Sequence, residues 1–110
     1  MSKLFRRTLA FMLGASSAVG TAFLWETPLL LAAFLSVIAI AFCQLRPHPR
    51  AWLIYLFAFV FGPLAEALAI FMGAWQYTAP DFLGVPLWLP FLWGNAALFI
   101  SHFRTGSDTV

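Results

Sequence analysis

The sequence predicts an all-α integral membrane protein, a four-helix transmembrane bundle with both termini on the cytoplasmic side (N-in/C-in). Three observations predict it. Of the 110 residues, 63% are hydrophobic and 9% are charged, whereas a globular domain carries about 25% charged residues. Four stretches are apolar and close to the roughly 20 residues that a spanning helix needs. All six Lys and Arg residues would lie at one end of four such helices.

The four predicted helices are separated by short connections that carry charged residues, prolines or turn residues. The spans comprise residues about 8–25, 28–45, 51–75 and 86–103. The connections comprise residues 26–27, 46–50 and 77–84. Pro47 and Pro49 interrupt the second connection, and Pro80 with Asp81 interrupts the third. Because the length suits one domain only, we expect a single transmembrane domain over residues 1–110.

The basic residues predict the orientation of the helices. They are Lys3, Arg6, Arg7, Arg46, Arg50 and Arg104. With four spans, all of them fall on the same side of the membrane, and the positive-inside rule assigns that side to the cytoplasm. Glu26 and Asp81 fall on the opposite side. We therefore expect a multi-pass protein of the cell (inner) membrane with both termini in the cytoplasm.

The first span leaves one alternative open. A basic start, an apolar run and the small residues at 19–22 also describe a signal peptide. Cleavage after Ala22 would leave three spans. The bulky residues 23–25 continue the apolar run, which favours a retained first span.

Three of the spans carry small or polar residues on one helical face. In lipid, helices approach each other through small residues and polar bonds, so we expect these faces to point inward. The faces comprise Ala10, Gly14, Ser17 and Thr21, then Ala32, Ser36, Ala39 and Cys43, then Gly62, Glu66, Ala69 and Gly73. The residues expected to pack helices are Gly14, Ser17, Thr21, Ser36, Gly62 and Gly73. Pro63 predicts a kink in the third span.

Glu66 is the candidate functional residue because it lies inside an apolar span. A carboxylate at bilayer depth costs several kcal/mol, with values from about 2.5 to over 10, so an acid in this position points to function by default. Burial disfavours the charged form, and we expect Glu66 to be uncharged when its surroundings are dry. It is also the candidate catalytic residue.

Asn95 is the predicted partner of Glu66. Counted from the expected outer helix ends, Glu66 lies about 15 Å deep and Asn95 about 13 Å deep, at about 1.5 Å per residue. The two helices are consecutive and antiparallel, so the side chains can meet. We predict a small pocket that opens to the outer leaflet, with Glu66 and Asn95 as its floor and aromatic walls. The candidate ligand-binding residues are Glu66, Asn95, Trp75, Tyr77 and Trp88.

Several kinds of site lack the residues they need. The lone Cys43 cannot form an intrachain disulfide, and His48 and His102 are not spaced as a metal pair. The sequence has no glycine-rich phosphate loop and no basic patch with interleaved aromatic residues. We expect no metal, no nucleic acid and no cofactor, apart from a bound lipid or isoprenoid.

Glu66 also opens a longer pattern of glycines, prolines and aromatic residues. The pattern comprises Glu66, Gly73, Trp75, Tyr77, Gly84-Val85-Pro86, Pro90 and Trp93. It resembles membrane carotenoid-modifying proteins of the bisanhydrobacterioruberin hydratase and lycopene-cyclase-like families. The resemblance implies that Glu66 corresponds to the helix Glu of those families and that the ligand is a long isoprenoid. The chain is shorter than the hydratases and lacks the paired acids of the cyclase pattern, which favours binding over catalysis.

Three functions fit these observations. The first is a small non-catalytic membrane protein that binds a lipid or isoprenoid, or that serves as an accessory subunit beside other membrane subunits or in a homo-oligomer. The second is a carotenoid- or isoprenoid-modifying enzyme, or a subunit of one, with Glu66 as general acid. The third is a small proton-coupled transporter, because the length, four spans and a membrane Glu resemble the small multidrug resistance family, where the Glu lies in the first helix. We take the first as our expectation.

Overall fold

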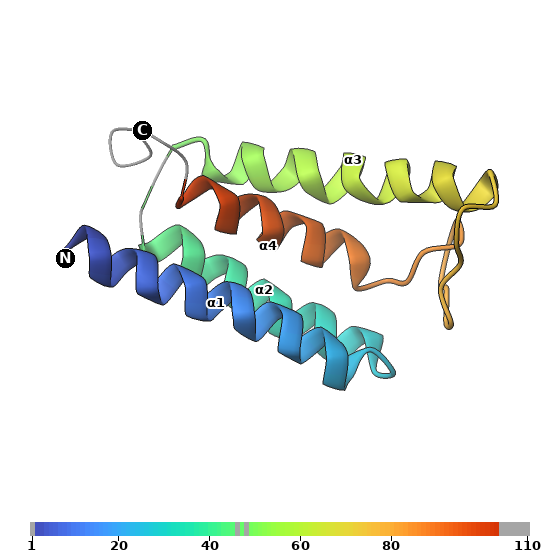
Figure 1. Ribbon diagram of the computed structural model, residues 1–110, viewed down its shortest axis with the longest axis horizontal. Helices are drawn as coiled ribbons and strands as arrows, with labels where there is room; N and C mark the ends of the chain where they lie inside the picture. The colour runs from blue at the N-terminus through green and yellow to red at the C-terminus, as the bar shows by residue number, and fades with distance from the viewer. Residues whose placement is uncertain (1, 46, 48, 104–110) are drawn as a thin grey trace.

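The computed structural model describes residues 2–45, 47 and 49–103 (Figure 1). This part of the chain forms four helices, which confirms the predicted all-α class. The helices are α1 (Lys3–Leu24), α2 (Pro28–Leu45), α3 (Ala51–Phe71) and α4 (Leu89–Ser101). The first three are long and apolar enough to cross a membrane. Helix α4 has 13 residues, fewer than the predicted span 86–103.

The ends of α1 and α4 differ from the prediction for local reasons. Helix α1 begins five residues before the expected start, because the Ser2 side chain caps it by accepting a hydrogen bond from the backbone N–H of Phe5 (3.1 Å). Helix α4 begins three residues late. Pro86 starts a turn there, and its carbonyl accepts a hydrogen bond from the N–H of Leu89 (3.1 Å).

Helix α3 ends at Phe71 rather than at residue 75, because Gly73 stops it. Gly73 has a φ of 90°, in the left-handed region that favours glycine. Its N–H donates to the carbonyl of Ile70, and the N–H of Ala74 donates to the carbonyl of Ala69. These two bonds form a Schellman cap. The expected packing role of Gly73 is therefore corrected: apart from Gly73 and its two chain neighbours, no described residue lies within 4 Å of the position that a Cβ would occupy there.

Helix α4 lies in the middle of the molecule, with α3 on one side and the α1–α2 pair on the other (Figure 1). Helix α3 packs mainly on α4, and α4 also contacts α2 and α1. The small-residue faces of α1 and α2 point inward as expected, with Ala10, Ser17, Ala32 and Ala39 buried, and α4 rather than α3 lies against these two helices. The layered order also places the shortest helix where the other three helices cover it.

Glycine–aromatic contacts join these layers. An added Cβ at Gly62 of α3 would lie 2.2 Å from the Trp93 ring of α4, and one at Gly94 of α4 would lie 2.4 Å from the Tyr55 ring of α3. Each helix therefore offers a glycine to an aromatic ring of the other. Gly14 of α1 receives the ring of Phe99 in the same way, at 2.4 Å. Only glycine permits an approach this close.

Between α3 and α4, the connection folds into a tight turn. Phe82 and Val85 pair as an isolated antiparallel bridge, and the two residues between them have positive φ, 49° for Leu83 and 80° for Gly84. An added Cβ at Gly84 would lie 3.1 Å from the Ile70 side chain, so the turn packs against the end of α3. Val85 is buried there. We refer to residues 82–85 as the hairpin.

The described charges separate along the long axis of the molecule. The starts of α1 and α3, with Lys3, Arg6, Arg7 and Arg50, lie at one end, and the α1–α2 turn and the hairpin lie at the other (Figure 1). Glu26 and Asp81 belong to this second end. Arg46, His48 and Arg104 lie outside the described residues. The separation matches the pattern from which the orientation was predicted.

Candidate functional site

Glu66 lies near the end of α3 rather than deep within a span. It stands five residues before Phe71, which is about 8 Å along the helix axis at about 1.5 Å per residue. The predicted depth of about 15 Å was too large because α3 ends earlier than expected. Its side chain is half-buried. A group on the α3–α4 connection can therefore reach it.

Two hydrogen bonds hold the carboxyl group of Glu66. Its Oε1 accepts a bond from the Tyr77 hydroxyl, and its Oε2 accepts one from the indole Nε1–H of Trp93. Tyr77 belongs to the α3–α4 connection, and Trp93 belongs to α4. Glu66 thus joins three segments of the chain at one point. The expectation that Glu66 is uncharged stays a prediction.

Gly62 explains why Trp93 can reach Glu66. Gly62 and Pro63 are the buried residues of α3, and the Trp93 ring lies against the backbone of Gly62. Residues four apart share a helical face, so Glu66 stands one turn beyond Gly62 on the same side. The glycine makes room for the ring, and the ring's N–H then points at the carboxyl group.

Tyr77 links Glu66 to the rest of the connection. Its ring meets the ring of Trp88 edge to face, with centroids 6.1 Å apart and an interplanar angle of 89°. Trp88 is buried and forms the N-cap position of α4. Burial and the hydrogen bond to Glu66 raise the pKa of the Tyr77 hydroxyl well above its ordinary value. Tyr77 therefore keeps its proton, which it donates to Glu66.

Asn95 belongs to a different contact, which corrects the predicted pocket floor. Its side chain is buried, and its Nδ2 donates to the carbonyl of Leu35 (2.9 Å) and to Oγ of Ser17 (3.3 Å). Asn95 thus joins α4 to α2 and α1. Trp93 and Asn95 are two residues apart, about 200° around a helix of 3.6 residues per turn. The same helix therefore turns Trp93 towards α3 and Asn95 away from it.

The remaining predicted residues fall in several places. Tyr77 and Trp88 lie together beside Glu66, whereas Trp75 is exposed beyond the end of α3. Ser17 accepts the bond from Asn95. Thr21 and Ser36 donate to the carbonyl four residues earlier in their own helices, those of Ser17 and Ala32.

Trp93 is a functional candidate that was not predicted among the ligand-binding residues. The sequence analysis placed it only in the pattern that resembles the carotenoid-modifying families. Its depth in the fourth span is close to that of Asn95, and a large ring needs a small residue opposite it. Gly62, one turn from Glu66, is such a residue. The pairing of a glycine with an aromatic residue at equal depth on consecutive helices was the available signal.

Two of the pockets formed by the described residues lie close to this group. A groove of about 230 Å³ lies between α3, the hairpin and the start of α4, and we name it the α3 groove. It is lined by Phe59, Val60, Pro63, Leu64, Ala67, Phe82, Leu83, Val85 and Pro90. A pocket of about 130 Å³ lies at the end of the molecule that carries the α1–α2 turn and the hairpin, and we name it the aromatic pocket. It is lined by Trp25, Tyr77, Thr78, Ala79, Pro86 and Trp88.

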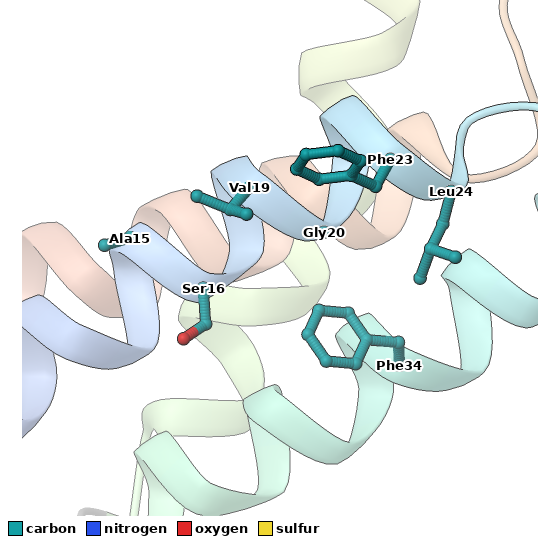
Figure 2. A pocket seen from close by; sticks show the side chains of 7 residues that line it. All are labelled: Ala15, Ser16, Val19, Gly20, Phe23, Leu24 and Phe34. Carbon is teal, nitrogen blue, oxygen red and sulfur yellow. The ribbon is translucent and has the colours of Figure 1, made fainter.

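A further groove, of about 490 Å³, lies over α1 and α2 (Figure 2). Phe34 of α2 projects towards Gly20 of α1, and Val19 and Phe23 of α1 also line the groove (Figure 2). Two helices alone form this groove, whereas three segments wall the α3 groove. The α3 groove is therefore the better shaped of the two for holding a ligand.

Metal ligation has no support in the described part of the chain. No group of three or more His, Cys, Asp or Glu residues lies close enough there to hold a metal ion. His102 is buried, and its ring packs on Phe42 with centroids 5.5 Å apart. Cys43 is a free cysteine.

Comparison with known proteins adds no relative. No protein-family model matches the chain, and no curated protein or solved structure matches it.

Proposed function

We propose that this protein is a non-catalytic, multi-pass membrane protein that binds the hydrocarbon chain of a lipid or isoprenoid in the α3 groove. The observation that carries the proposal is the groove's lining, which consists entirely of apolar side chains from three segments. Pro63 and Ala67 come from α3, Pro90 comes from α4, and the hairpin forms the remaining wall. A polar ligand would lose its hydrogen bonds to water there without replacement, whereas a hydrocarbon chain would not.

The groove faces the surface through which a lipid would enter. Val60 and Leu64 line it and are also exposed, at 41% and 48%. They lie on the side of α3 that α4 does not cover. In a bilayer this side meets acyl chains, so a chain can pass from the bilayer into the groove without crossing water.

Catalysis by Glu66 has less support. A general acid must present a proton to the substrate. Both carboxyl oxygens of Glu66 are engaged by donors from the same chain, Tyr77 and Trp93. This arrangement supports a role in holding the α3–α4 connection in place. It weighs equally against proton coupling in a transporter.

Filling the α3 groove tests the proposal. Replacing Ala67 with phenylalanine should place a ring in the groove and reduce the lipid that co-purifies with the protein about fivefold or more, because the ring and the ligand compete for one apolar volume. The measurement is mass spectrometry of lipids after gentle native purification. Ala65→Phe is the matched control, since Ala65 is exposed on α3 and does not line the groove.

The outcomes separate lipid binding from its alternatives. Equal lipid in both variants and in the wild type would refute the groove as the binding site. A stoichiometric protein partner without specific lipid would instead favour the accessory-subunit function. A new pigment in a carotenoid-making host, lost with Glu66→Ala, would favour catalysis.

We also propose that the basic end of the molecule faces the cytoplasm, in the cell (inner) membrane. The positive-inside rule supports this orientation. In a Cys43→Ala background, Thr78→Cys should react with a membrane-impermeant maleimide in intact cells, and Pro49→Cys should react only after permeabilisation. Both positions are exposed, at opposite ends of the molecule. The reverse labelling pattern, or labelling of both in intact cells, would refute the orientation.

A further inference from the structure

The aromatic pocket gathers three aromatic side chains from three separate parts of the chain. Trp25 is the C-cap residue of α1, Tyr77 belongs to the α3–α4 connection, and Trp88 is the N-cap residue of α4. Thr78 adds a polar group to the lining. The volume of about 130 Å³ is close to the roughly 150 Å³ that holds benzene in an engineered cavity. The pocket therefore suits a group of a few heavy atoms.

The charges around this pocket favour a cation. Two acidic residues, Glu26 and Asp81, lie outside the helices at this end of the molecule. Glu26 directly follows Trp25 in the chain. The described basic residues stand at the starts of α1 and α3, at the opposite end (Figure 1). An anion in this pocket would meet negative charge and no described Lys or Arg.

The hydrogen bond between Tyr77 and Glu66 strengthens this preference. A phenol that donates its proton to a carboxyl oxygen gains electron density on its ring, and the face of an aromatic ring attracts cations. Tyr77 is held by that bond and by the edge-to-face contact with Trp88. Two of the three rings are thus fixed before a ligand arrives. In a preformed site, binding loses less free energy to the ordering of side chains.

We infer that the aromatic pocket binds an organic ammonium group, such as the trimethylammonium of choline. Aromatic rings that surround a small volume recognise quaternary ammonium ions through cation–π attraction. The group can belong to a lipid headgroup at the membrane surface or to a free amine in solution. The pocket shares no lining residue with the α3 groove, so this inference goes beyond the proposed function and can fail or succeed without it.

To test the inference, choline binding to the full-length protein in phosphatidylglycerol nanodiscs is measured by isothermal titration calorimetry. The uncharged comparison is 3,3-dimethylbutanol, which replaces the nitrogen of choline with carbon. Choline should bind about tenfold or more tightly than this isostere, because only the cation gains the attraction of the rings. Equal affinity of the two compounds would overturn the inference, since it would leave only apolar contact.

Variants of Trp25 locate the site. Trp25→Leu should weaken choline binding about tenfold, and Trp25→Phe, which keeps an aromatic face, should weaken it about threefold or less. Trp52→Leu is the matched control, because Trp52 is exposed at the start of α3, far from the pocket. Unchanged binding with Trp25→Leu would overturn the inference. Thermal unfolding of each variant shows whether it is folded. If Trp25→Leu does not fold, Trp25→Phe still tests whether the pocket needs an aromatic ring at this position.

A second nanodisc composition identifies the source of the ammonium group. If the headgroup of a membrane lipid is the occupant, phosphatidylcholine nanodiscs should weaken the apparent affinity for free choline by competition. If a free amine is the ligand, the affinity should be the same in both nanodiscs. Either result supports recognition of the ammonium group, provided that the isostere binds more weakly.

Discussion

Replacing Gly62 with alanine is expected to lower the free energy of unfolding by about 1 to 3 kcal/mol, because overpacking costs about that much. The added Cβ would lie 2.2 Å from the Trp93 ring. The ring must then move away from α3. Since the Trp93 N–H donates to Glu66, that movement also breaks the bond that fastens α4 to the carboxyl group.

The measurement is unfolding of the purified protein in mixed micelles, followed by loss of helical circular dichroism. Ala65→Ser is the control on the same helix, because Ala65 is exposed. This variant should remain within about 0.5 kcal/mol of the wild type. A Gly62→Ala variant as stable as the control would show that Trp93 does not depend on Gly62.

A double variant separates the clash from a general effect of alanine. In a Trp93→Leu background the large ring is absent, so Gly62→Ala should cost much less than it does in the wild-type protein. The expected coupling between the two sites is about 1 to 3 kcal/mol, the range for residues in contact. Additive effects would contradict a direct contact between the ring and the glycine.

The helices were predictable because their causes are local. Apolar runs separated by prolines and charges predicted four helices, and four are present in the described residues. The start of α2 at Pro28 and that of α3 at Ala51 agree with the prediction. The end of α3 does not agree with the prediction, because the sequence analysis assigned Gly73 to the small-residue face of the helix. Its neighbours are apolar, so hydropathy continues past the residue where the backbone turns.

The site was predictable in part. Glu66, Tyr77 and Trp88 were named as candidates, and the structure brings them together. The partner from α4 was not predictable from depth, since depth along a helix says nothing about rotation around it. Trp93 and Asn95 differ by only two residues, yet they face different layers. Rotation depends on contacts between helices, such as the ring of Tyr55 on Gly94.

The central position of α4 was also beyond reach from the sequence. Three small-residue stripes predicted which faces of the first three helices point inward, but not which helix each face meets. The most extensive contact joins α3 to α4, through rings that lie on glycines. Such contacts depend on which ring meets which glycine, and a chain with 13 Phe, 5 Trp and 7 Gly residues offers many pairings.

Removing the Glu66 side chain is the second change with a large expected effect. Glu66→Ala leaves the Tyr77 hydroxyl and the Trp93 N–H without their acceptor. Each hydrogen bond contributes about 0.5 to 1.5 kcal/mol net, so we expect a loss of about 1 to 3 kcal/mol in the free energy of unfolding. Tyr77→Phe removes one donor and should cost about 1 kcal/mol. Glu26→Ala, at an exposed acid in the α1–α2 turn, is the control and should be near neutral.

A double-mutant cycle tests whether Glu66 and Tyr77 act together. In a Glu66→Ala background the Tyr77 hydroxyl has lost its acceptor, so Tyr77→Phe should no longer destabilise the protein and can stabilise it. The coupling should reach about 1 to 2 kcal/mol. A coupling near zero would mean that the connection is held by the contact with Trp88 and the hairpin, and that Glu66 has another purpose.

The hydrogen bond between Tyr77 and Glu66 should also change how stability depends on pH. Burial and the bond to Glu66 raise the pKa of Tyr77 in the folded state, whereas an unfolded tyrosine has a pKa of about 10. Above about pH 10 the unfolded chain loses a proton that the folded protein keeps, so stability falls as the pH rises. Tyr77→Phe lacks this proton, and its stability should fall less over the same range. The difference in free energy of unfolding between the wild type and Tyr77→Phe should therefore be largest at about pH 8 and smaller by about pH 11. A constant difference would mean that the Tyr77 hydroxyl is not held by Glu66, and α3 would then be fastened to the connection by apolar contact alone.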